Sequence, residues 1–277
     1  MERSGRELCL VHANCQGEPL ELLLGASPEF RARWHIRHYT NYTKKLVPAE
    51  DLKNATLFLY QHLGPEWEAV SSETLLGALN PKAVSLCIPN MFFKGYWPFW
   101  SSAGPMNFAD ALLEKLYASG AGKPEILKIY LHGDVTKMTD IDAVLAETLR
   151  VEEAKERRCD VKTAAFVAAH WQKRRLFQTV NHPGEELLLL MAQGILARLG
   201  LPLLDAETCA SFQYGYEGFQ LPIHPQVAAH LGLPFGGEET AYPVFGRYMT
   251  FAQYVSRYID CRMNGFEDSF LAYLQVI

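Results

Sequence analysis

The sequence predicts an α/β fold, in which a parallel sheet of the Rossmann type is flanked by helices and followed by a largely helical C-terminal half. Short apolar, strand-like runs alternate with helix-compatible segments over roughly the first ninety residues. After Asn107, apolar residues recur at helical spacing instead. Strands that alternate with helices favour parallel pairing through right-handed crossovers, and neither part contains an internal repeat.

Four strands are expected in the first part of the chain. They cover residues 7–13, 34–39, 56–60 and 83–88. The first run is buried in character, and the second alternates between two faces. A short helix is expected at 18–24, with Pro19 in its first turn, where the missing N–H costs nothing.

An aromatic segment, residues 89–100, interrupts this pattern. It carries too many rings for a linker and too much Pro and Gly for a helix. Two interpretations stay open, a plug over the core and the wall of a pocket, since loops carry sites but large rings need burial.

Helices dominate the rest of the chain. Apolar stripes predict helices around residues 141–149, 161–171, 187–199 and 251–259, and the third is apolar almost all round. Between the second and third lies the β-prone run 176–180, which is expected to add a strand to the sheet. We expect an α/β core over 1–135 and a helical portion over 136–277, packed together as one integrated domain.

Composition restricts the class of protein. The net charge of -5 gives no reason to expect a nucleic-acid partner. No apolar stretch approaches the roughly 20 residues that span a bilayer, and the N-terminus lacks a secretory pattern, so a cytoplasmic location is expected. The six cysteines form no CxxC pair or zinc-type cluster, and no metal site is predicted.

Cys15 is the cysteine whose position suggests chemistry. It follows the first strand and precedes a helix, at the carboxyl edge of the sheet where α/β proteins form their sites. Free N–H groups and the helix dipole there would lower the pKa of its thiol and hold an oxyanion. The alternative is a structural cysteine, which is the expected role of Cys9 and Cys87 inside apolar runs.

A nucleophilic cysteine needs a base, and His182 is the best candidate. It follows the short run 176–180 and precedes the long apolar helix, which places an imidazole at another strand end. His224 is a weaker rival, also ahead of a helix. The remaining strand histidines are expected to be structural: His12, His35 and His38.

Further candidates are amides and cations. Gln61 ends the third strand, where its amide is suited either to an oxyanion or to a neighbouring backbone group. Basic residues cluster at 155–158 and at 173–175, and they suit either a solvated helix face or a phosphate-bearing ligand.

At these motifs the sequence resembles the WcbI family of capsular polysaccharide biosynthesis enzymes. The resemblance rests on Asn14-Cys15-Gln16, on the region of Gln61, and on the motif from Phe177 to Pro183. The motif layout is also similar to that of SGNH hydrolases, in which a serine follows the first strand and a DxxHP motif precedes the last helix. Cys15 stands at the serine position and Thr179 at the aspartate position, which favours a Cys–His dyad over a full triad.

The resemblance implies a coenzyme A-dependent acetyltransferase that O-acetylates a capsular polysaccharide or its sugar precursor, with acetyl-CoA as the small-molecule donor. The implied catalytic residues are Cys15 as nucleophile, His182 as base, and Gln16 and Gln61 at the oxyanion. The implied coenzyme A contacts are Asn14, Lys94, Lys173, Arg174, Arg175 and Asn181.

Two alternatives to this function remain. One is an SGNH-like esterase or thioesterase with water as acceptor, and the other is a non-catalytic coenzyme A- or sugar-binding protein. Direct transfer, with Cys15 only positioning the donor, also stays open. The acceptor sugar and the oligomeric state are not predicted.

Overall fold

The computed structural model describes residues 5–104, 106–214, 218–266 and 270–276. The chain divides into two compact units, each built from separate segments. The first unit comprises Met1–Phe92, Val151–Ala168 and His182–Tyr214. The second comprises Phe93–Arg150, Ala169–Asn181 and Gly215–Ile277. The division of the chain into an α/β core and a helical portion at residue 135 remains a prediction. Along the chain, segments of the two units alternate.

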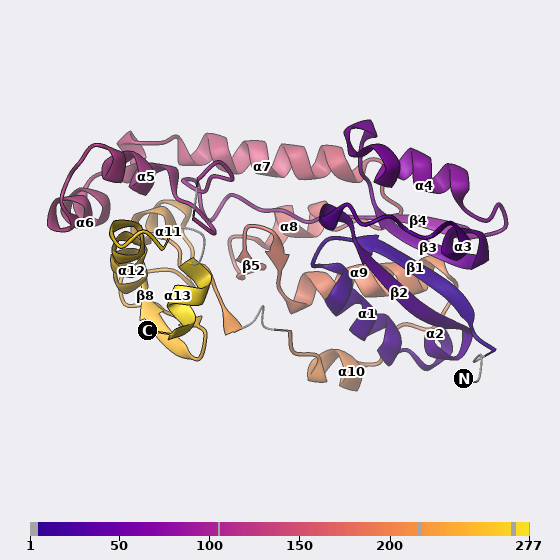
Figure 1. The fold of residues 1–277 in the computed structure, drawn as a ribbon. Coiled ribbons are helices and arrows are strands. Elements are labelled where there is room, and N and C mark those ends of the chain that lie inside the picture. Colours follow the sequence, from indigo (N-terminus) through magenta and orange to yellow (C-terminus); the bar gives the residue numbers. More distant parts are fainter. Residues whose placement is uncertain (1–4, 105, 215–217, 267–269, 277) are drawn as a thin grey trace. The chain divides into compact units, whose positions relative to one another are not determined.

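A four-stranded parallel sheet forms the centre of the first unit, as predicted (Figure 1). Its strands are β1 (Glu7–Ala13), β2 (Trp34–Thr40), β3 (Ala55–Gln61) and β4 (Val84–Ile88). The spatial order is β2-β1-β3-β4, so β1 and β3 are the central strands. All three pairings are parallel, which brings the carboxyl ends of the four strands to one edge.

Short helices connect these strands. They are α1 (Gly17–Ala26), α2 (Pro28–Arg33), α3 (Ala49–Asn54) and α4 (Ser72–Ala78), with 3₁₀ turns η1 (Asn41–Thr43) and η2 (Pro65–Val70). Later segments add β6 (His182–Pro183), α9 (Glu185–Arg198) and α10 (Ala206–Ser211). The α/β class is therefore confirmed.

The two faces of the sheet are both covered by apolar side chains. Leu10 and Phe58 point to the face where Leu52 of α3 and Leu75 of α4 complete a buried cluster. Because strand side chains alternate, Cys9 and Val11 point to the opposite face, and both are fully buried. Helices α1 and α9 pack against each other, and α1 also contacts β1.

The second unit is mostly helical. Its helices are α5 (Ala111–Ala118), α6 (Lys123–His132), α11 (Pro225–Leu231), α12 (Phe251–Met263) and α13 (Phe270–Val276), with the 3₁₀ turn η3 (Val135–Lys137). Helices α7 (Ile141–Glu156) and α8 (Ala164–His170) each contain residues of both units. The antiparallel hairpin of β7 (Ala241–Val244) and β8 (Arg247–Thr250) was not anticipated from the sequence.

The run 176–180 does form a strand, β5 (Phe177–Thr179), but it does not join the four-stranded sheet. Its backbone bonds to segments of the second unit instead. The N–H of Leu221 donates to the Gln178 carbonyl at 2.9 Å, and the N–H of Phe93 donates to the Val180 carbonyl at 2.7 Å. The expectation that this run adds a strand to the sheet was wrong. Its backbone carbonyls accept hydrogen bonds from Leu221 and Phe93 rather than from a strand of the sheet.

The aromatic segment forms much of the core of the second unit. Phe93 stacks on Phe177 with ring centroids 5.3 Å apart, and Tyr96 meets Phe93 edge-on at 4.7 Å. The indole N–H of Trp97 donates to the Leu221 and Pro222 carbonyls. A cavity of about 40 Å³ remains beside Trp97 and Phe99. The segment is therefore chiefly a packed core that also lines one small cavity.

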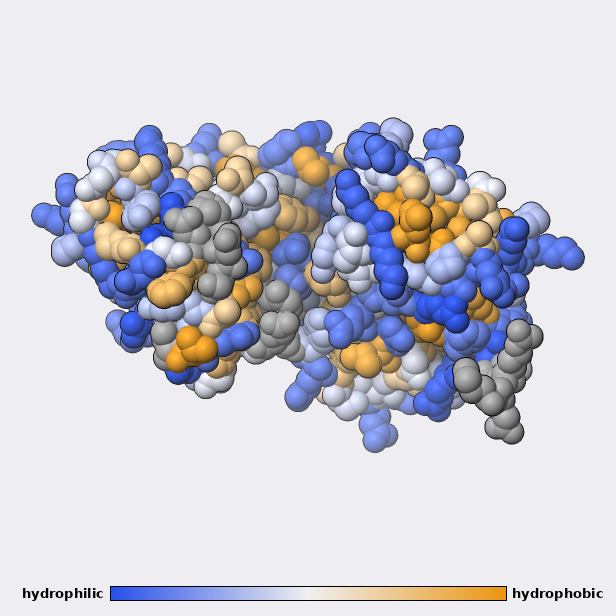
Figure 2. All heavy atoms as spheres, viewed as in Figure 1, coloured by the Kyte–Doolittle hydropathy of each residue, from blue (hydrophilic) through white to orange (hydrophobic). Residues whose placement is uncertain are grey.

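In the described part of the chain, every helix is too short or too polar to cross a bilayer. Figure 2 shows apolar patches that are separated by hydrophilic side chains on the displayed face.

Candidate active site

The turn after β1 is shaped by Asn14. Its side-chain oxygen accepts the Gln16 N–H at 2.9 Å, and its carbonyl accepts the Gly17 N–H at 2.9 Å. This Asx-type turn leads into α1, which begins at Gly17 with Gln16 as its N-cap. A side chain at position 17 would collide with the His38 ring, since an added Cβ would lie 2.4 Å from its Nε2. Any larger residue would force the His38 ring away from its contact with the Ala13 carbonyl, which favours glycine where α1 begins.

Cys15 and His182 lie within hydrogen-bond distance, with 3.2 Å between Sγ and Nε2. Each residue shortly precedes a helix, α1 for Cys15 and α9 for His182, and these two helices pack together. The packing of α1 on α9 thus brings together two residues 167 positions apart. Cys15 is half-buried and His182 is buried.

Burial makes both members of this pair prefer the neutral form. It lowers the pKa of His182 to about 4. Burial also raises the pKa of the Cys15 thiol, although the N–H groups of Cys15 and Gln16 act in the opposite direction. The expectation of a lowered thiol pKa was therefore wrong, because desolvation outweighs the backbone N–H groups.

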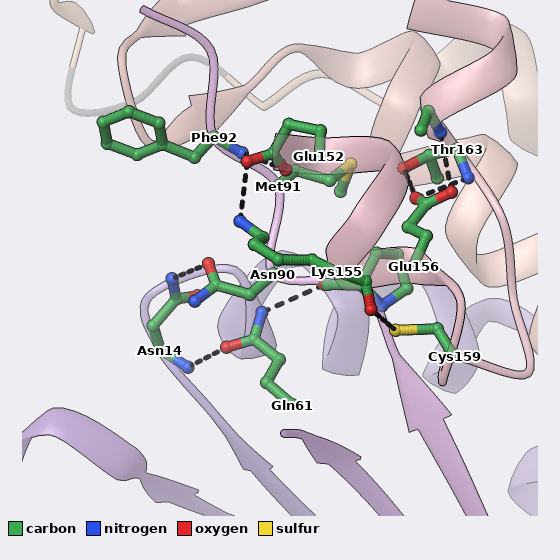
Figure 3. Close-up of polar contacts among 12 residues, drawn as sticks. Asn14, Gln61, Asn90, Met91, Phe92, Glu152, Lys155, Glu156, Cys159 and Thr163 are labelled. Carbon is green, nitrogen blue, oxygen red and sulfur yellow. Dashed lines mark hydrogen bonds and ion pairs between the residues drawn. The ribbon is translucent and has the colours of Figure 1, made fainter. Parts of the chain in front are cut away.

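An amide network fixes the edge of the sheet around the turn (Figure 3). Gln61 Oε1 accepts the Asn14 N–H at 2.8 Å. Gln61 Nε2 donates to Gln16 Oε1 and to the Pro89 carbonyl, each at 3.2 Å. Gln16 in turn pairs with the backbone of Met91 through both its amide oxygen and its amide nitrogen. The network ties the end of β1 to the ends of β3 and β4.

These contacts assign Gln16 and Gln61 to positioning. Gln61 is fully buried, and its amide nitrogen donates to two protein acceptors. The Gln16 N–H is bound to Asn14, and its side-chain nitrogen is bound to Met91. The expectation that Gln16 and Gln61 contact an oxyanion directly is not favoured, because their donors are engaged within the protein.

Asn90 is a residue that the sequence did not single out. It follows β4 and is half-buried, and its Oδ1 accepts the Asn14 side-chain N–H at 3.1 Å (Figure 3). That contact directs the oxygen of the amide toward Asn14 and leaves its nitrogen as a donor from the same edge. Its position directly after the fourth strand could have indicated a site residue. The sequence analysis instead treated Asn90 as part of the aromatic segment, residues 89–100.

Glu152 stabilises the same edge of the sheet. It lies in the part of α7 that belongs to the first unit. Its carboxylate accepts the Phe92 N–H at 3.2 Å and pairs with Lys155 at 2.7 Å (Figure 3). Burial raises its pKa to about 7, although Lys155 counteracts the shift. The sequence analysis did not identify Glu152 either, because nothing in the sequence distinguishes it from the other acidic residues of this polar helix.

The rival base, His224, is structural. It lies buried in the second unit, where Nδ1 accepts the Gln226 N–H and Nε2 contacts the Tyr130 carbonyl at 3.1 Å. Nδ1 thus caps the start of α11, and Nε2 contacts the backbone of α6. His12 is also buried, which agrees with a structural role.

The predicted coenzyme A contacts differ in their surroundings. Arg175 donates to the carbonyls of Phe177, Gln178 and Leu221 and lies over the Trp97 and Tyr242 rings. It holds the second unit together, contrary to the expectation of a phosphate contact. The others in that unit remain predictions: Lys94, which is half-buried, Lys173 and Arg174, which are exposed, and Asn181, whose Oδ1 accepts the Thr179 hydroxyl.

The thiol, the imidazole and the amides at the carboxyl edge of a parallel sheet define a candidate site of nucleophilic chemistry. A comparison with protein families matches residues 8–204 to the polysaccharide biosynthesis enzyme WcbI. The chain therefore belongs to the WcbI family of polysaccharide biosynthesis enzymes, and the resemblance seen in the sequence is confirmed.

A solved structure of WcbI, described as a novel polysaccharide biosynthesis enzyme, has the same fold. The TM-score is 0.76 at 19% sequence identity, over 97% of this chain and 94% of that chain. That structure is described as the native protein without a disulfide bond between coenzyme A and a cysteine. Comparison with the curated proteins yields no match.

Proposed function

We propose that this protein is a coenzyme A-dependent acyltransferase that O-acetylates a capsular polysaccharide or its sugar precursor. The observation that carries the proposal is the 3.2 Å contact between Cys15 Sγ and His182 Nε2. A thiol beside an uncharged imidazole is the arrangement that nucleophilic acyl transfer needs. Membership of a polysaccharide biosynthesis family supports a sugar hydroxyl as acceptor.

Coenzyme A as the donor is supported by the related WcbI structure, whose description names coenzyme A in stating that its disulfide bond to a cysteine is absent. The residues at the sheet edge suit a thioester. Cys15 is half-buried rather than fully enclosed, and Asn90 offers an amide donor from the end of β4. Lys94, Lys173 and Arg174 are the cations proposed for the phosphates.

In the first half-reaction, Cys15 Sγ attacks the thioester carbonyl while His182 Nε2 takes the thiol proton. His182 then gives this proton to the departing thiolate, and Cys15 carries the acetyl group. Exchange of one thioester for another is nearly balanced. Because His182 is a weak base here, the proton moves as the sulfur attacks, rather than beforehand.

In the second half-reaction, His182 takes the proton of a sugar hydroxyl, whose oxygen attacks the acetyl-Cys15 carbonyl. The thiolate leaves and recovers the proton from His182. Forming an ester from a thioester runs downhill, so this step drives the transfer. The Asn90 amide and the Cys15 N–H are the donors proposed for the oxyanion of both steps.

The test is the intact mass of the full chain after mixing with acetyl-CoA. We expect one acetyl adduct that is absent from Cys15→Ala and present in Cys209→Ala, a half-buried thiol of the same unit. Asn90→Ala should slow acetylation by about 100-fold, the usual cost of losing one oxyanion donor.

Absence of the adduct despite coenzyme A binding would contradict the covalent mechanism. Release of free acetate without any sugar acceptor, at the same rate as acetylation of Cys15, would identify a thioesterase instead.

A further inference from the structure

Two cysteines far from each other in sequence meet at the edge of the first unit. Cys87 lies in β4 and Cys159 follows α7, and their sulfurs are 3.6 Å apart. At this distance the two sulfurs are in van der Waals contact, so no other atom separates them. Cys87 is buried and Cys159 is half-buried, and both are free thiols.

The backbones of the two cysteines are held at a fixed spacing. Asp160, next to Cys159, donates its N–H to the Cys87 carbonyl at 2.8 Å and accepts the Cys87 N–H on its carboxylate at 2.7 Å. The Cys159 N–H donates to the Glu156 carbonyl at 3.0 Å. A bond between the sulfurs therefore needs a rotation of the side chains and little movement of the backbone.

The helix end that carries Cys159 is itself anchored. The Glu156 carboxylate accepts the N–H groups of Thr163 and Ala164 at 2.7 and 2.9 Å and also the Thr163 hydroxyl (Figure 3). These bonds fix the loop from α7 to α8 on both sides of Cys159. The close approach of the sulfurs is thus part of a rigid arrangement.

The contact also prepares one sulfur for oxidation. Contact with the Cys159 sulfur, 3.6 Å away, lowers the pKa of Cys87 despite its burial and the nearby Asp160 carboxylate. The N–H of His62 and the guanidinium of Arg158 act in the same direction as Cys159. Thiolate character at one of two touching sulfurs is the property that makes a thiol pair reactive toward oxidants.

We propose that Cys87 and Cys159 form a redox-active dithiol, a modification site that hydrogen peroxide closes to a disulfide. The Cys87 thiolate attacks one peroxide oxygen, the O–O bond breaks, and hydroxide leaves to give a sulfenic acid. The Cys159 sulfur then attacks the Cys87 sulfur, the S–O bond breaks, and water leaves with the thiol proton. Two thiols lose two electrons, and one peroxide becomes two waters.

The disulfide would fasten the end of α7 to the carboxyl end of β4. Ile88 to Phe92 directly follow Cys87, and this segment holds Gln16, Gln61 and Asn14 through the contacts described above. A cross-link between residues 72 positions apart restricts the unfolded chain, so the oxidised form is the more stable one. The proposal uses neither Cys15 nor His182 and is independent of the proposed acyl transfer.

The experiment treats the full chain with hydrogen peroxide, alkylates the remaining thiols under denaturing conditions and maps the peptides without reduction. We expect a linked Cys87–Cys159 peptide pair, lighter by two hydrogen atoms than the separate thiols and released by dithiothreitol. The oxidised protein should melt about 5 °C higher than the reduced protein. Cys15→Ala and Cys209→Ser should form the same link.

Cys159→Ser is the informative variant, because this half-buried position tolerates a small polar side chain more readily than Cys87. In this variant peroxide should leave Cys87 as a sulfenic acid that dimedone labels. The proposal is overturned if peroxide oxidises Cys15 or Cys209 while both Cys87 and Cys159 are still alkylated. It is equally overturned if Cys87 in Cys159→Ser is labelled no faster than the buried Cys9.

Discussion

Cys15 and His182 are both uncharged in the resting protein near neutral pH, since burial raises the pKa of the thiol and lowers that of the imidazole to about 4. This distinguishes the pair from a preformed thiolate–imidazolium pair, in which the thiolate persists at acidic pH. The nucleophile is then generated only as it attacks. Because the thiolate is the form that reacts with oxidants and alkylating agents, a neutral Cys15 thiol is expected to react slowly with both.

The alkylation rate of Cys15 by iodoacetamide tests this charge state. Because the thiol pKa is raised, the thiolate fraction should grow about tenfold for each pH unit between pH 6 and pH 8. The measurement follows the Cys15 peptide by mass spectrometry, with Cys209 as the internal reference thiol. A rate that stays constant from pH 5 to pH 8 would establish an ion pair instead.

At the scale of one element, the first-unit end of α7 stabilises the segment after β4. Glu152 accepts the Phe92 N–H, and the Phe92 backbone follows Asn90 and Met91, which contact Asn14 and Gln16. The pKa of Glu152 is raised to about 7, so the folded protein binds a proton between about pH 4.5 and pH 7 that the unfolded chain has released. The Glu152 contribution to stability is therefore present at low pH and is lost as pH rises through this window.

Glu152→Gln should remove this pH dependence. Relative to the wild type, the variant should gain on the order of 2 kcal/mol of unfolding free energy between pH 5 and pH 8, because its amide carries no charge to desolvate. Urea unfolding at several pH values measures the difference. Glu147→Gln, an exposed position of the same helix, is the matched control and should follow the wild type. If the unfolding free energies of Glu152→Gln and the wild type changed equally with pH, Glu152 would not be the source of this pH dependence.

At the scale of the whole molecule, local patterns were enough to predict much of the fold. The run at 7–13 coincides with β1, and the apolar stripe near Leu187 lies within α9. Both of these features depend on the periodicity of apolar residues along the chain. The closeness of Cys15 and His182 was also predicted, but from two strand ends meeting at one edge of a single sheet, whereas β5 lies outside that sheet and the packing of α1 on α9 brings the two residues together.

Features that depend on distant packing escaped prediction. Desolvation of Cys15 reverses the effect expected from the helix start, and it comes from residues that the sequence does not place around the thiol. Asn90, Glu152 and the contact between Cys87 and Cys159 depend on how the loop after β4 meets α7. β5 lies outside the four-stranded sheet, and the run that contains it bonds to the distant residues Leu221 and Phe93, which no local pattern near residue 177 indicates.

The discontinuous units lead to a prediction about the fragment of residues 1–135, the expected α/β core. This fragment contains β1 to β4 but lacks α9, whose buried apolar side chains complete the first unit. These are Leu187, Leu188, Met191, Ile195 and Leu196, all fully buried. Each contributes roughly 1.5–3 kcal/mol, so their loss, on the order of 10 kcal/mol, rivals the about 5–15 kcal/mol that stabilises a whole domain.

The fragment also contains α5 and α6 without α12, which packs on α6 in the second unit. We therefore expect residues 1–135 alone to show no cooperative thermal transition by circular dichroism, under conditions in which the full chain unfolds cooperatively. Adding residues 136–277 in trans should restore both the transition and coenzyme A binding, because it supplies α9 with His182 and α12. A fragment that folds alone would establish a continuous N-terminal domain and make α9 an accessory to the sheet.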